Sequence, residues 1–355
     1  MSGLPALNAG FPTDLSYLRL HLNESPYGMC DGARRIIEAR LGDASYYPDS
    51  DCADLRHAIS AAHGISYDMV MVGSGIDHLV LEIALAFRDK VSGGLVTAST
   101  YPAYAMSLSA AGMPFLVVPA RKFAIDTDLL ISAALSSPRL VFLCNPHNPS
   151  GTVIEKSTMA DICATTARAG GVLVVDEAYS EYVTRTRRED CSVIGLVRAG
   201  WPILALRTFS KAYGLAGLRV GYAVAARALI DRIRGVRNAT PFMVNRLALD
   251  AARASIADRA FVERVSDETR ANRSYLSEWL SRLQLAPVAS EANFILVGPL
   301  PDSGGVTEHL RDEYRILVRD VAQFGLPGYI RVTVSDGEKM DRFMSCFQTL
   351  LTTVG

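Results

Sequence analysis

Between residues 70 and 225 the chain repeats one order of elements: a short apolar run, a loop rich in glycine, proline or polar residues, and a segment with helical spacing. The apolar runs have the length and composition of buried strands, at 70–72, 95–97, 115–118, 140–144, 172–175, 202–206 and 220–225. Strands that alternate with helices are typical of a mostly parallel sheet with right-handed crossovers. We therefore predict an α/β fold whose ligand loops gather at the carboxyl ends of the strands.

A second, smaller α/β region is predicted toward the C-terminus. Helical patterns fill residues 226–285, and strand-like runs follow within 290–297, at 316–319 and at 329–334. Residues 1–20 contain turn formers without strong periodicity, which is typical of an arm rather than a core element.

Composition limits the classes of function. The 355 residues suffice for one large domain or two modest ones, and the 36 basic and 37 acidic side chains nearly cancel. Neither nucleic acid nor an anionic membrane is therefore favoured as a partner. Apolar stretches stay well short of the roughly 20 residues that span a bilayer. The first 20 residues lack a signal-peptide pattern, so we expect a cytoplasmic protein.

The cysteines are scattered, without a Cys-x-x-Cys pair or a histidine at zinc-ligand spacing. Free, mostly buried thiols are expected rather than a disulfide framework, and no metal site is expected. The six positions are Cys30, Cys52, Cys144, Cys163, Cys191 and Cys346.

Lys211 lies in a polar, glycine-rich stretch after the apolar run 202–206. An amine in a partly apolar pocket has its charged form disfavoured, so it can attack an aldehyde and form a Schiff base. The nearby hydroxyls of Thr208 and Ser210 and the guanidinium of Arg219 suit a phosphate dianion. An amine for an aldehyde beside a phosphate cradle favours pyridoxal phosphate as cofactor. The alternative is an exposed lysine in a glycine-rich turn.

Asp176 ends the apolar run 172–175. A carboxylate in a buried position is costly unless it meets a cation, and the protonated ring nitrogen of pyridoxal phosphate is such a cation. Tyr179, three residues on, can reach the phenolic oxygen of the same ring. Alternatively, Asp176 is a metal-binding carboxylate of a nucleotide hydrolase, which the absence of a Gly-x-x-x-x-Gly-Lys-Ser/Thr loop disfavours.

A glycine-containing loop, residues 73–78, opens a helix and offers backbone N–H groups to an anion. The six-residue dinucleotide fingerprint is incomplete there, because His78 occupies the place of its third glycine. This departure disfavours a nicotinamide-dependent dehydrogenase.

Residues 207–221 resemble the lysine motif of the fold-type I aminotransferases, Ser-x-Ser-Lys followed by Gly-Leu-Arg-x-Gly, with Thr208 in place of the first serine. The resemblance covers about residues 20–345, with the motifs in family order, and it is strongest to the histidinol-phosphate aminotransferases. It implies the pyridoxal-phosphate-dependent transferase fold of type I, with a mostly parallel sheet of the seven-stranded type and a smaller α/β domain. The implied division is an arm and part of the small domain at 1–40, a large cofactor-binding domain at 41–240, and the small domain at 241–355.

The resemblance also implies how the cofactor is held. Lys211 would bind its aldehyde, Tyr101 would stack on the ring, and Asp176 would face the ring nitrogen. Asn148 comes from an Asn-Pro-His-Asn-Pro-Ser-Gly loop at 145–151 that resembles the family's Asn-Pro-x-Asn-Pro-Thr-Gly, and it would join Tyr179 at the phenolic oxygen. The phosphate would be bound by the amides of Ile76 and Asp77, by Thr208, Ser210 and Arg219, and by Tyr47 of the second subunit of a homodimer.

Four further residues are implied to bind substrate. The loop 22–28 resembles the family's Asn-Glu-Asn-Pro-Tyr-Gly opening, which makes Asn23 and Tyr27 candidates. Arg331 matches the strand arginine that forks onto the substrate α-carboxylate or its equivalent, and Arg319 matches one that binds the substrate phosphate. Ordinary turns and surface ion pairs are the alternatives.

The expected reaction is a ping-pong transfer of an amino group between an amino acid, or histidinol phosphate, and a 2-oxo acid. Lys211 would serve as nucleophile and as general base. Two departures, Asp336 after the last strand and His147 in the 145–151 loop, leave a specialised amino acid aminotransferase open. A decarboxylase of the threonine-phosphate type is another alternative. A non-catalytic ligand sensor is a third, although such sensors carry a helix-turn-helix extension for which we expect no room.

Overall fold

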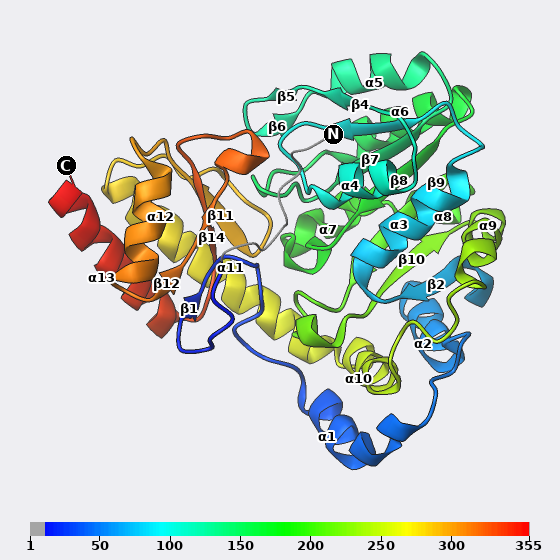
Figure 1. Cartoon of the computed structure of the whole chain (residues 1–355), viewed down its shortest axis with the longest axis horizontal. Coiled ribbons are helices and arrows are strands. Elements are labelled where there is room, and N and C mark those ends of the chain that lie inside the picture. Colours follow the sequence, from blue (N-terminus) through cyan, green and yellow to red (C-terminus); the bar gives the residue numbers. More distant parts are fainter. Residues whose placement is uncertain (1–10, 355) are drawn as a thin grey trace.

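A computed structural model describes residues 11–354 of the chain, so the first ten residues of the predicted arm lie outside the described part. A seven-stranded sheet forms the larger layer, with the order β2-β10-β9-β8-β7-β3-β4 (Figure 1). Its strands are β2 (Val70–Gly73), β3 (Gly94–Thr97), β4 (Phe115–Val118), β7 (Leu140–Cys144), β8 (Val172–Asp176), β9 (Ile203–Thr208) and β10 (Gly221–Ala225). The predicted fold class is confirmed.

One strand runs against the others. β10 pairs antiparallel with both β2 and β9, whereas β4, β3, β7, β8 and β9 are parallel neighbours. Between β9 and β10 the chain forms only a single short 3-10 helix, η4 (Ala216–Leu218), and a parallel crossover needs a longer connection. The chain therefore returns beside β9 in the opposite direction.

Helices cover the sheet. Every position of β7, β8 and β10 is buried, which requires both faces of the sheet centre to be covered. α3 (Gly75–Phe87) contacts β2, β9 and β10, while α5 (Thr127–Leu135) contacts β3 and β4. The remaining helices of this part include α1 (Asp31–Arg40), α2 (Ala53–His63), α4 (Ala103–Ala110), α6 (Lys156–Arg168), α7 (Arg185–Cys191), α8 (Ile194–Arg198), α9 (Arg227–Arg237) and α10 (Arg246–Ala257).

The smaller region has its own sheet, β11-β14-β13, built from β11 (Phe294–Val297), β13 (Arg319–Asp320) and β14 (Ile330–Thr333). Figure 1 shows α12 (Ser303–Asp312), α13 (Gly337–Val354) and part of the long α11 (Arg259–Arg282) beside it. The N-terminal segment joins this region, because β1 (Leu18–Arg19) pairs in parallel with β12 (Ile316–Leu317).

The two larger hydrophobic cores match these two regions, and a third small cluster consists of Leu296, Val321 and Phe324. The larger core extends along the chain as far as Val265 in α11, and also includes Phe294. The smaller one combines Leu18 and Leu20 with residues from Leu276 onward. The boundaries at residues 40 and 240 stay a prediction.

The apolar runs located the main strands closely. β4 and β7 have the predicted bounds, β9 differs by one residue at its start and two at its end, and the other four differ by one residue at one end. A small hairpin of β5 (Ala120–Arg121) and β6 (Ala124–Ile125) was not predicted. All six cysteines are free thiols, five of them buried. Among the described residues, none of the helices combines the length and apolar character needed to cross a bilayer.

Candidate active site

A cavity of about 520 Å³ opens at the carboxyl ends of the central strands. Cys144, Asp176 and Thr208, the last residues of β7, β8 and β9, all line it. Loops at this end of a parallel sheet are where ligands bind in α/β proteins. The predicted site residues that line the cavity are Asn23, Ile76, Asp77, Tyr101, Asn148, Asp176, Tyr179, Thr208, Ser210, Lys211, Arg219, Arg319 and Arg331.

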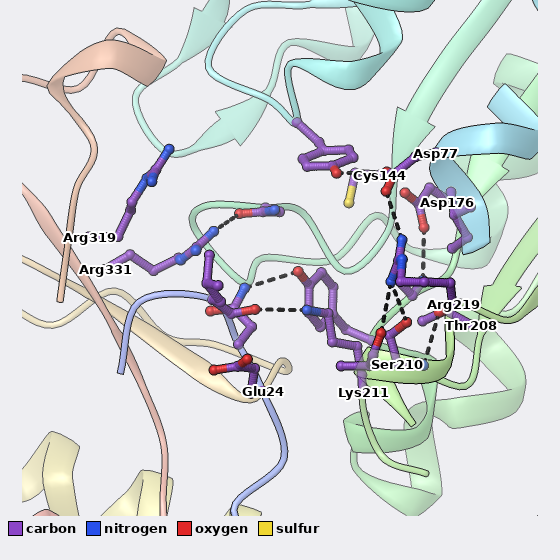
Figure 2. A pocket seen from close by; sticks show the side chains of 18 of the residues that line it. Glu24, Asp77, Cys144, Asp176, Thr208, Ser210, Lys211, Arg219, Arg319 and Arg331 are labelled. Carbon is purple, nitrogen blue, oxygen red and sulfur yellow. Dashed lines mark hydrogen bonds and ion pairs between the residues drawn. The ribbon is translucent and has the colours of Figure 1, made fainter. Parts of the chain in front are cut away.

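Lys211 lies in the middle of this cavity in Figure 2. Its Nζ donates a hydrogen bond to the backbone carbonyl of Leu22 at 2.8 Å and lies 5.9 Å from the centre of the Tyr179 ring. Burial, with the nearby Arg331 guanidinium, lowers the pKa of Lys211 to about 8. A neutral amine is therefore accessible near neutral pH, as an amine nucleophile requires.

One side of the cavity is built to hold an anion. Arg219 donates to Ser210 Oγ at 3.3 Å and pairs with Asp77 at 3.0 Å, while Thr208 Oγ1 accepts the Ser210 amide at 3.0 Å. α3 begins at Gly75 without a side-chain cap, so its first N–H groups stay available to an anion. Gly75 has a φ of +77°, and a Cβ there would lie 2.6 Å from an Arg219 nitrogen. The positive φ favours glycine, and a side chain at this position would displace the Arg219 guanidinium.

The carboxylate of Asp176 lies on the same side of the cavity, deeper in the protein. Oδ2 accepts the hydroxyl of Tyr104 at 2.7 Å, and Oδ1 accepts the backbone amide of Ala178 at 3.0 Å. Asp176 is 4% exposed, and burial raises its pKa to about 6. Among the described residues it forms no ion pair, so the buried carboxylate is suited to a cationic group of a ligand.

Arg331 and Arg319 lie on the opposite side of the cavity, as Figure 2 shows. Arg331 donates to Asn148 Oδ1 at 2.5 Å and to the His21 carbonyl at 2.7 Å, while its buried Nε has no partner among the described residues. Tyr179 also lines the cavity, and its hydroxyl accepts a hydrogen bond from Asn23 at 3.0 Å.

Arg319 is buried between aromatic rings. Its Cζ lies 5.1 Å from the ring centre of Phe11 and 5.6 Å from that of Phe324. The side-chain oxygen of Gln323, in its preferred amide orientation, accepts from Arg319 at 3.0 and 3.1 Å. Burial and the adjacent Arg331 lower the pKa of Arg319 to about 10, so the guanidinium stays charged at neutral pH.

Two predicted site residues lie outside the cavity lining. Tyr27 is half-buried and accepts a hydrogen bond from Asn272 at 3.3 Å. Tyr47 is 79% exposed, and its ring contacts that of Phe242 with 4.9 Å between the centres. Its predicted role requires a second subunit, so this placement leaves the role a prediction.

The two sequence departures also lie away from the lining. Asp336 accepts the Lys339 amide at 3.1 Å at the start of α13 and pairs with Lys339 Nζ at 2.6 Å. It therefore does not place a carboxylate among the residues that line the cavity near Arg331. His147 is buried in its loop, with Nδ1 2.8 Å from Ser150 Oγ, and burial lowers its pKa to about 4. Neither departure therefore changes the side chains that line the cavity.

The cavity also includes residues that the sequence did not indicate. Leu22 contributes its backbone carbonyl, and because every residue has one, the side-chain type gives no indication of this role. Phe324 belongs to a short 3-10 helix, η5 (Ala322–Phe324), near Arg319. The unpredicted lining residues are Leu22, Glu24, Cys144, Ala178, Ala216, Gly217 and Phe324.

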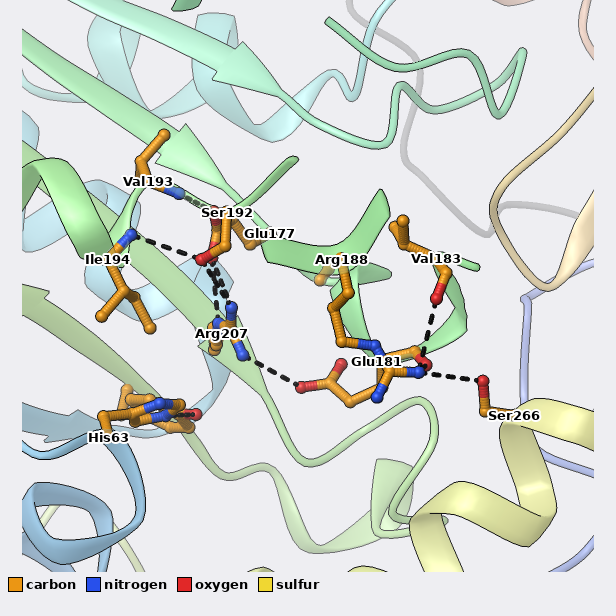
Figure 3. Close-up of polar contacts among 12 residues, drawn as sticks. His63, Glu177, Glu181, Val183, Arg188, Ser192, Val193, Ile194, Arg207 and Ser266 are labelled. Atoms are coloured by element: carbon orange, nitrogen blue, oxygen red, sulfur yellow. Dashed lines mark hydrogen bonds and ion pairs between the residues drawn. The ribbon is translucent and has the colours of Figure 1, made fainter. Parts of the chain in front are cut away.

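A buried ion-pair cluster lies beside the same strand ends (Figure 3). Arg207 precedes Thr208 in β9, and because side chains alternate along a strand it points to the opposite face of the sheet, where it pairs with Glu177, the residue after β8. Glu177 Oε2 accepts two bonds from Arg207, at 2.9 and 2.8 Å, and Oε1 accepts the Val193 amide at 2.6 Å. Glu181 Oε1 lies 3.7 Å from a terminal nitrogen of the same Arg207 guanidinium.

These groups fit pyridoxal phosphate. Asp176 is a buried carboxylate without an ion-pair partner in the described part of the chain, which suits a protonated ring nitrogen. The start of α3 with Ser210 and Arg219 suits the phosphate, and the Lys211 amine suits the aldehyde. Fold and site together define a pyridoxal-phosphate-dependent enzyme of fold type I.

Comparison with known proteins places the chain within that class. The family model described as aminotransferase class I and II matches residues 17–347, and the chain belongs to this family. It is 36% identical over 337 residues to histidinol-phosphate aminotransferase 1 of Cupriavidus pinatubonensis, covering 94% of this chain and 88% of the relative. It is 33% identical to the histidinol-phosphate aminotransferase of Moorella thermoacetica, covering 94% and 85%.

Solved structures agree with this assignment. The histidinol-phosphate aminotransferase of Sinorhizobium meliloti in complex with pyridoxal-5'-phosphate has a TM-score of 0.85 at 26% identity, covering 96% of this chain and 92% of that one. The L-threonine-O-3-phosphate decarboxylase of Porphyromonas gingivalis has a TM-score of 0.81 at 22% identity, covering 94% and 99%. The second likeness concerns the fold alone. The predicted family is confirmed, and the chain is an enzyme similar to histidinol-phosphate aminotransferases.

Proposed function

We propose that this enzyme transfers the amino group of histidinol phosphate to a 2-oxo acid in two alternating half-reactions. The supporting observation is the order of groups across one cavity. The anion cradle and Asp176 lie on one side, the Lys211 amine in the middle, and the guanidiniums of Arg319 and Arg331 on the other (Figure 2). An amine with an anionic group at its far end fits between them.

Lys211 has the central role in the proposed mechanism. Bound pyridoxal phosphate supplies the aldehyde that takes up the amino group and a ring that accepts the electron pair from the substrate α-carbon. Lys211 would hold the cofactor through that aldehyde in the absence of substrate. With substrate bound, its neutral Nζ would be the base that takes and returns the proton of the α-carbon. The pKa of about 8 keeps part of the amine neutral for this step.

Other residues hold the reacting parts in place. Asp176 would keep the ring nitrogen protonated, and Tyr101 would lie on the ring. Tyr179 and Asn148 would bind the phenolic oxygen, while the amides of Ile76 and Asp77, with Thr208, Ser210 and Arg219, would bind the cofactor phosphate.

Arg319 and Arg331 would bind the phosphate of the amino donor, and Arg331 would also bind the α-carboxylate of the 2-oxo acid, with Asn23 and Tyr27 beside the substrate. We further propose a homodimer in the cytoplasm, in which Tyr47 completes the phosphate site of the partner. The domain division at residues 40 and 240 belongs to the same proposal.

The experiment follows products as well as turnover. The purified enzyme is offered histidinol phosphate, histidinol, aspartate, an aromatic amino acid or threonine phosphate, each with 2-oxoglutarate, and glutamate and carbon dioxide are both measured. We expect glutamate from histidinol phosphate and little from histidinol, because histidinol lacks the anionic group that two guanidiniums can bind.

Each other result would contradict part of the proposal. Glutamate formed only from unphosphorylated amino acids would indicate a specialised amino acid aminotransferase, and carbon dioxide from threonine phosphate would indicate a decarboxylase. Ligand binding without any product would indicate a sensor. The Lys211→Ala variant is the control, and residual turnover by it would exclude the lysine as the reacting amine.

A further inference from the structure

Tyr104 is a buried side chain that belongs to none of the motifs considered above. It is the second residue of α4 and has no exposed surface. Its ring is stacked on Phe142 of β7, with centres 5.4 Å apart and planes 10° apart, and meets the ring of Tyr101 edge-on at 5.7 Å. Rings on two sides leave the phenol little freedom to rotate away.

The hydroxyl of Tyr104 points at the Asp176 carboxylate and donates to Oδ2 at 2.7 Å. The other oxygen, Oδ1, accepts the Ala178 amide at 3.0 Å. Each oxygen therefore has one protein donor, and two donors on different oxygens fix the plane of the carboxylate. One donor is the backbone amide of Ala178, which among the natural residues only proline lacks, whereas the other is a single side-chain hydroxyl.

We propose that Tyr104 is a positioning residue, which acts through Asp176 to hold the ring nitrogen of pyridoxal phosphate protonated. The proposal rests on the proposed role of Asp176 toward that nitrogen. Tyr104 itself would touch neither cofactor nor substrate, since it is absent from the cavity lining among the described residues.

The charges around Asp176 explain why a donor is needed. Burial raises the pKa of Asp176, and the negative charge of Asp77 raises it further. The Tyr104 hydroxyl, the Ala178 amide and the positive charge of Lys211 lower it. Burial also raises the pKa of Tyr104 well above its ordinary value, so the phenol keeps its proton and remains a donor. Burial keeps the neighbouring Cys144 a neutral thiol by raising its pKa.

A Tyr104→Phe substitution tests this role with the smallest available change. It keeps the ring stack and removes one oxygen atom, so the carboxylate loses a charge-assisted hydrogen bond and protonates more readily. A neutral Asp176 no longer attracts the protonated ring nitrogen.

The readout is the affinity of the cofactor-free protein for two ligands, pyridoxal phosphate and its analogue with carbon in place of the ring nitrogen. We expect Tyr104→Phe to weaken binding of pyridoxal phosphate by about tenfold or more. Binding of the carbon analogue should be unchanged, because that ligand has no ring nitrogen for Asp176 to face. A 3-fluorotyrosine at position 104 keeps the donor and should retain the preference for pyridoxal phosphate.

The matched control is Tyr222→Phe. Tyr222 is equally buried, and its hydroxyl lies 2.8 Å from His63 Nε2, away from the residues that line the cavity. Loss of the Tyr222 hydroxyl should not weaken the binding of one ligand more than that of the other. If Tyr104→Phe weakened both ligands equally, or neither, Tyr104 would be a packing residue and the inference would be overturned.

Asp176→Asn separates this inference from the function on which it rests. If Asp176→Asn loses the preference for pyridoxal phosphate and Tyr104→Phe keeps it, only the role of Tyr104 is wrong. If Asp176→Asn binds both ligands as the wild type does, Asp176 does not serve the ring nitrogen, and both proposals are overturned.

Discussion

The environment of the Lys211 amine determines when it can react. Lys211 is partly buried, and its pKa is lowered to about 8 by burial and by Arg331. Only the neutral amine attacks an aldehyde, so below that pH the reactive fraction falls about tenfold per pH unit.

This pKa makes a kinetic prediction. We expect the rate at which the cofactor-free enzyme binds pyridoxal phosphate to rise with pH up to about 8 and then to level off. With an ordinary lysine the rate would keep rising up to a pH of about 10.4. The measurement is the growth of visible absorbance after mixing with pyridoxal phosphate, and Lys211→Ala should show none of it. A rate that still climbs steeply beyond the expected plateau would contradict the lowered pKa.

Residues with distinctive chemistry could be predicted at this scale. Lys211, Asp176 and Arg219 were found because an amine, a strand-end carboxylate and a guanidinium each suggest a reaction or a charge. Leu22 was missed because its contribution is a backbone carbonyl. Tyr104 was missed because a buried tyrosine near a helix start reads as a core residue, and its direction toward Asp176 depends on the packing of β7 and α4.

At the scale of elements, the ends of β8 and β9 are joined by the buried pair of Glu177 and Arg207. The Glu177 side chain is fully buried and that of Arg207 is 11% exposed. Removing one partner of such a pair leaves an uncompensated charge in the interior.

We expect Glu177→Gln to lower the free energy of unfolding of the cofactor-free protein by about 3–5 kcal/mol, measured by urea denaturation. The matched control is Glu268→Gln, which breaks the exposed pair of Glu268 with Arg264 and should cost about 0.5 kcal/mol or less. Equal losses in the two variants would show that the buried pair does not stabilise the strand ends.

The elements themselves were largely predictable, because runs of apolar residues locate strands that are buried on both faces. The antiparallel direction of β10 was not predictable, because the composition of an apolar run does not indicate whether the strand runs parallel or antiparallel to its neighbours. The β5–β6 hairpin was missed because each of its strands has only two residues and no alternation to detect.

At the scale of the whole molecule, Tyr47 and three large apolar side chains near it in space or in sequence are exposed. Tyr47 and Phe242 touch, and Leu41 and Tyr46 lie close to Tyr47 in sequence. Their exposed fractions are 79%, 45%, 63% and 69% respectively. A second copy of the chain would cover them, as the proposed homodimer requires.

Hybrid dimers test this arrangement. We expect Tyr47→Phe to weaken pyridoxal phosphate binding by about tenfold, because a hydrogen bond to a charged group is lost. In a dimer of one Tyr47→Phe subunit and one Lys211→Ala subunit, the intact lysine would receive Tyr47 from its partner. Its affinity should therefore return to that of the wild type. A hybrid that binds as weakly as the Tyr47→Phe homodimer would place Tyr47 outside the partner's site.

The contribution of a second subunit could be predicted only from the family resemblance, since an exposed tyrosine after a short helix carries no physical signal of its own. The two-region organisation was predictable from the order of the strands. The pairing of β1 with β12 was not predictable, because a strand of two residues has no sequence pattern from which to assign a partner.

The segment that follows β1 has a mechanical consequence. Three consecutive residues meet three different groups of the cavity: His21 accepts from Arg331, Leu22 accepts from Lys211, and Asn23 donates to Tyr179. β1 itself is fastened to the smaller sheet region through β12. Arg331 belongs to the smaller region through β14, so its link moves with that region, whereas the links to Lys211 and Tyr179 cross to the large sheet. A shift of the smaller region relative to the large sheet would therefore strain the contacts of the Lys211 amine and of Tyr179 together.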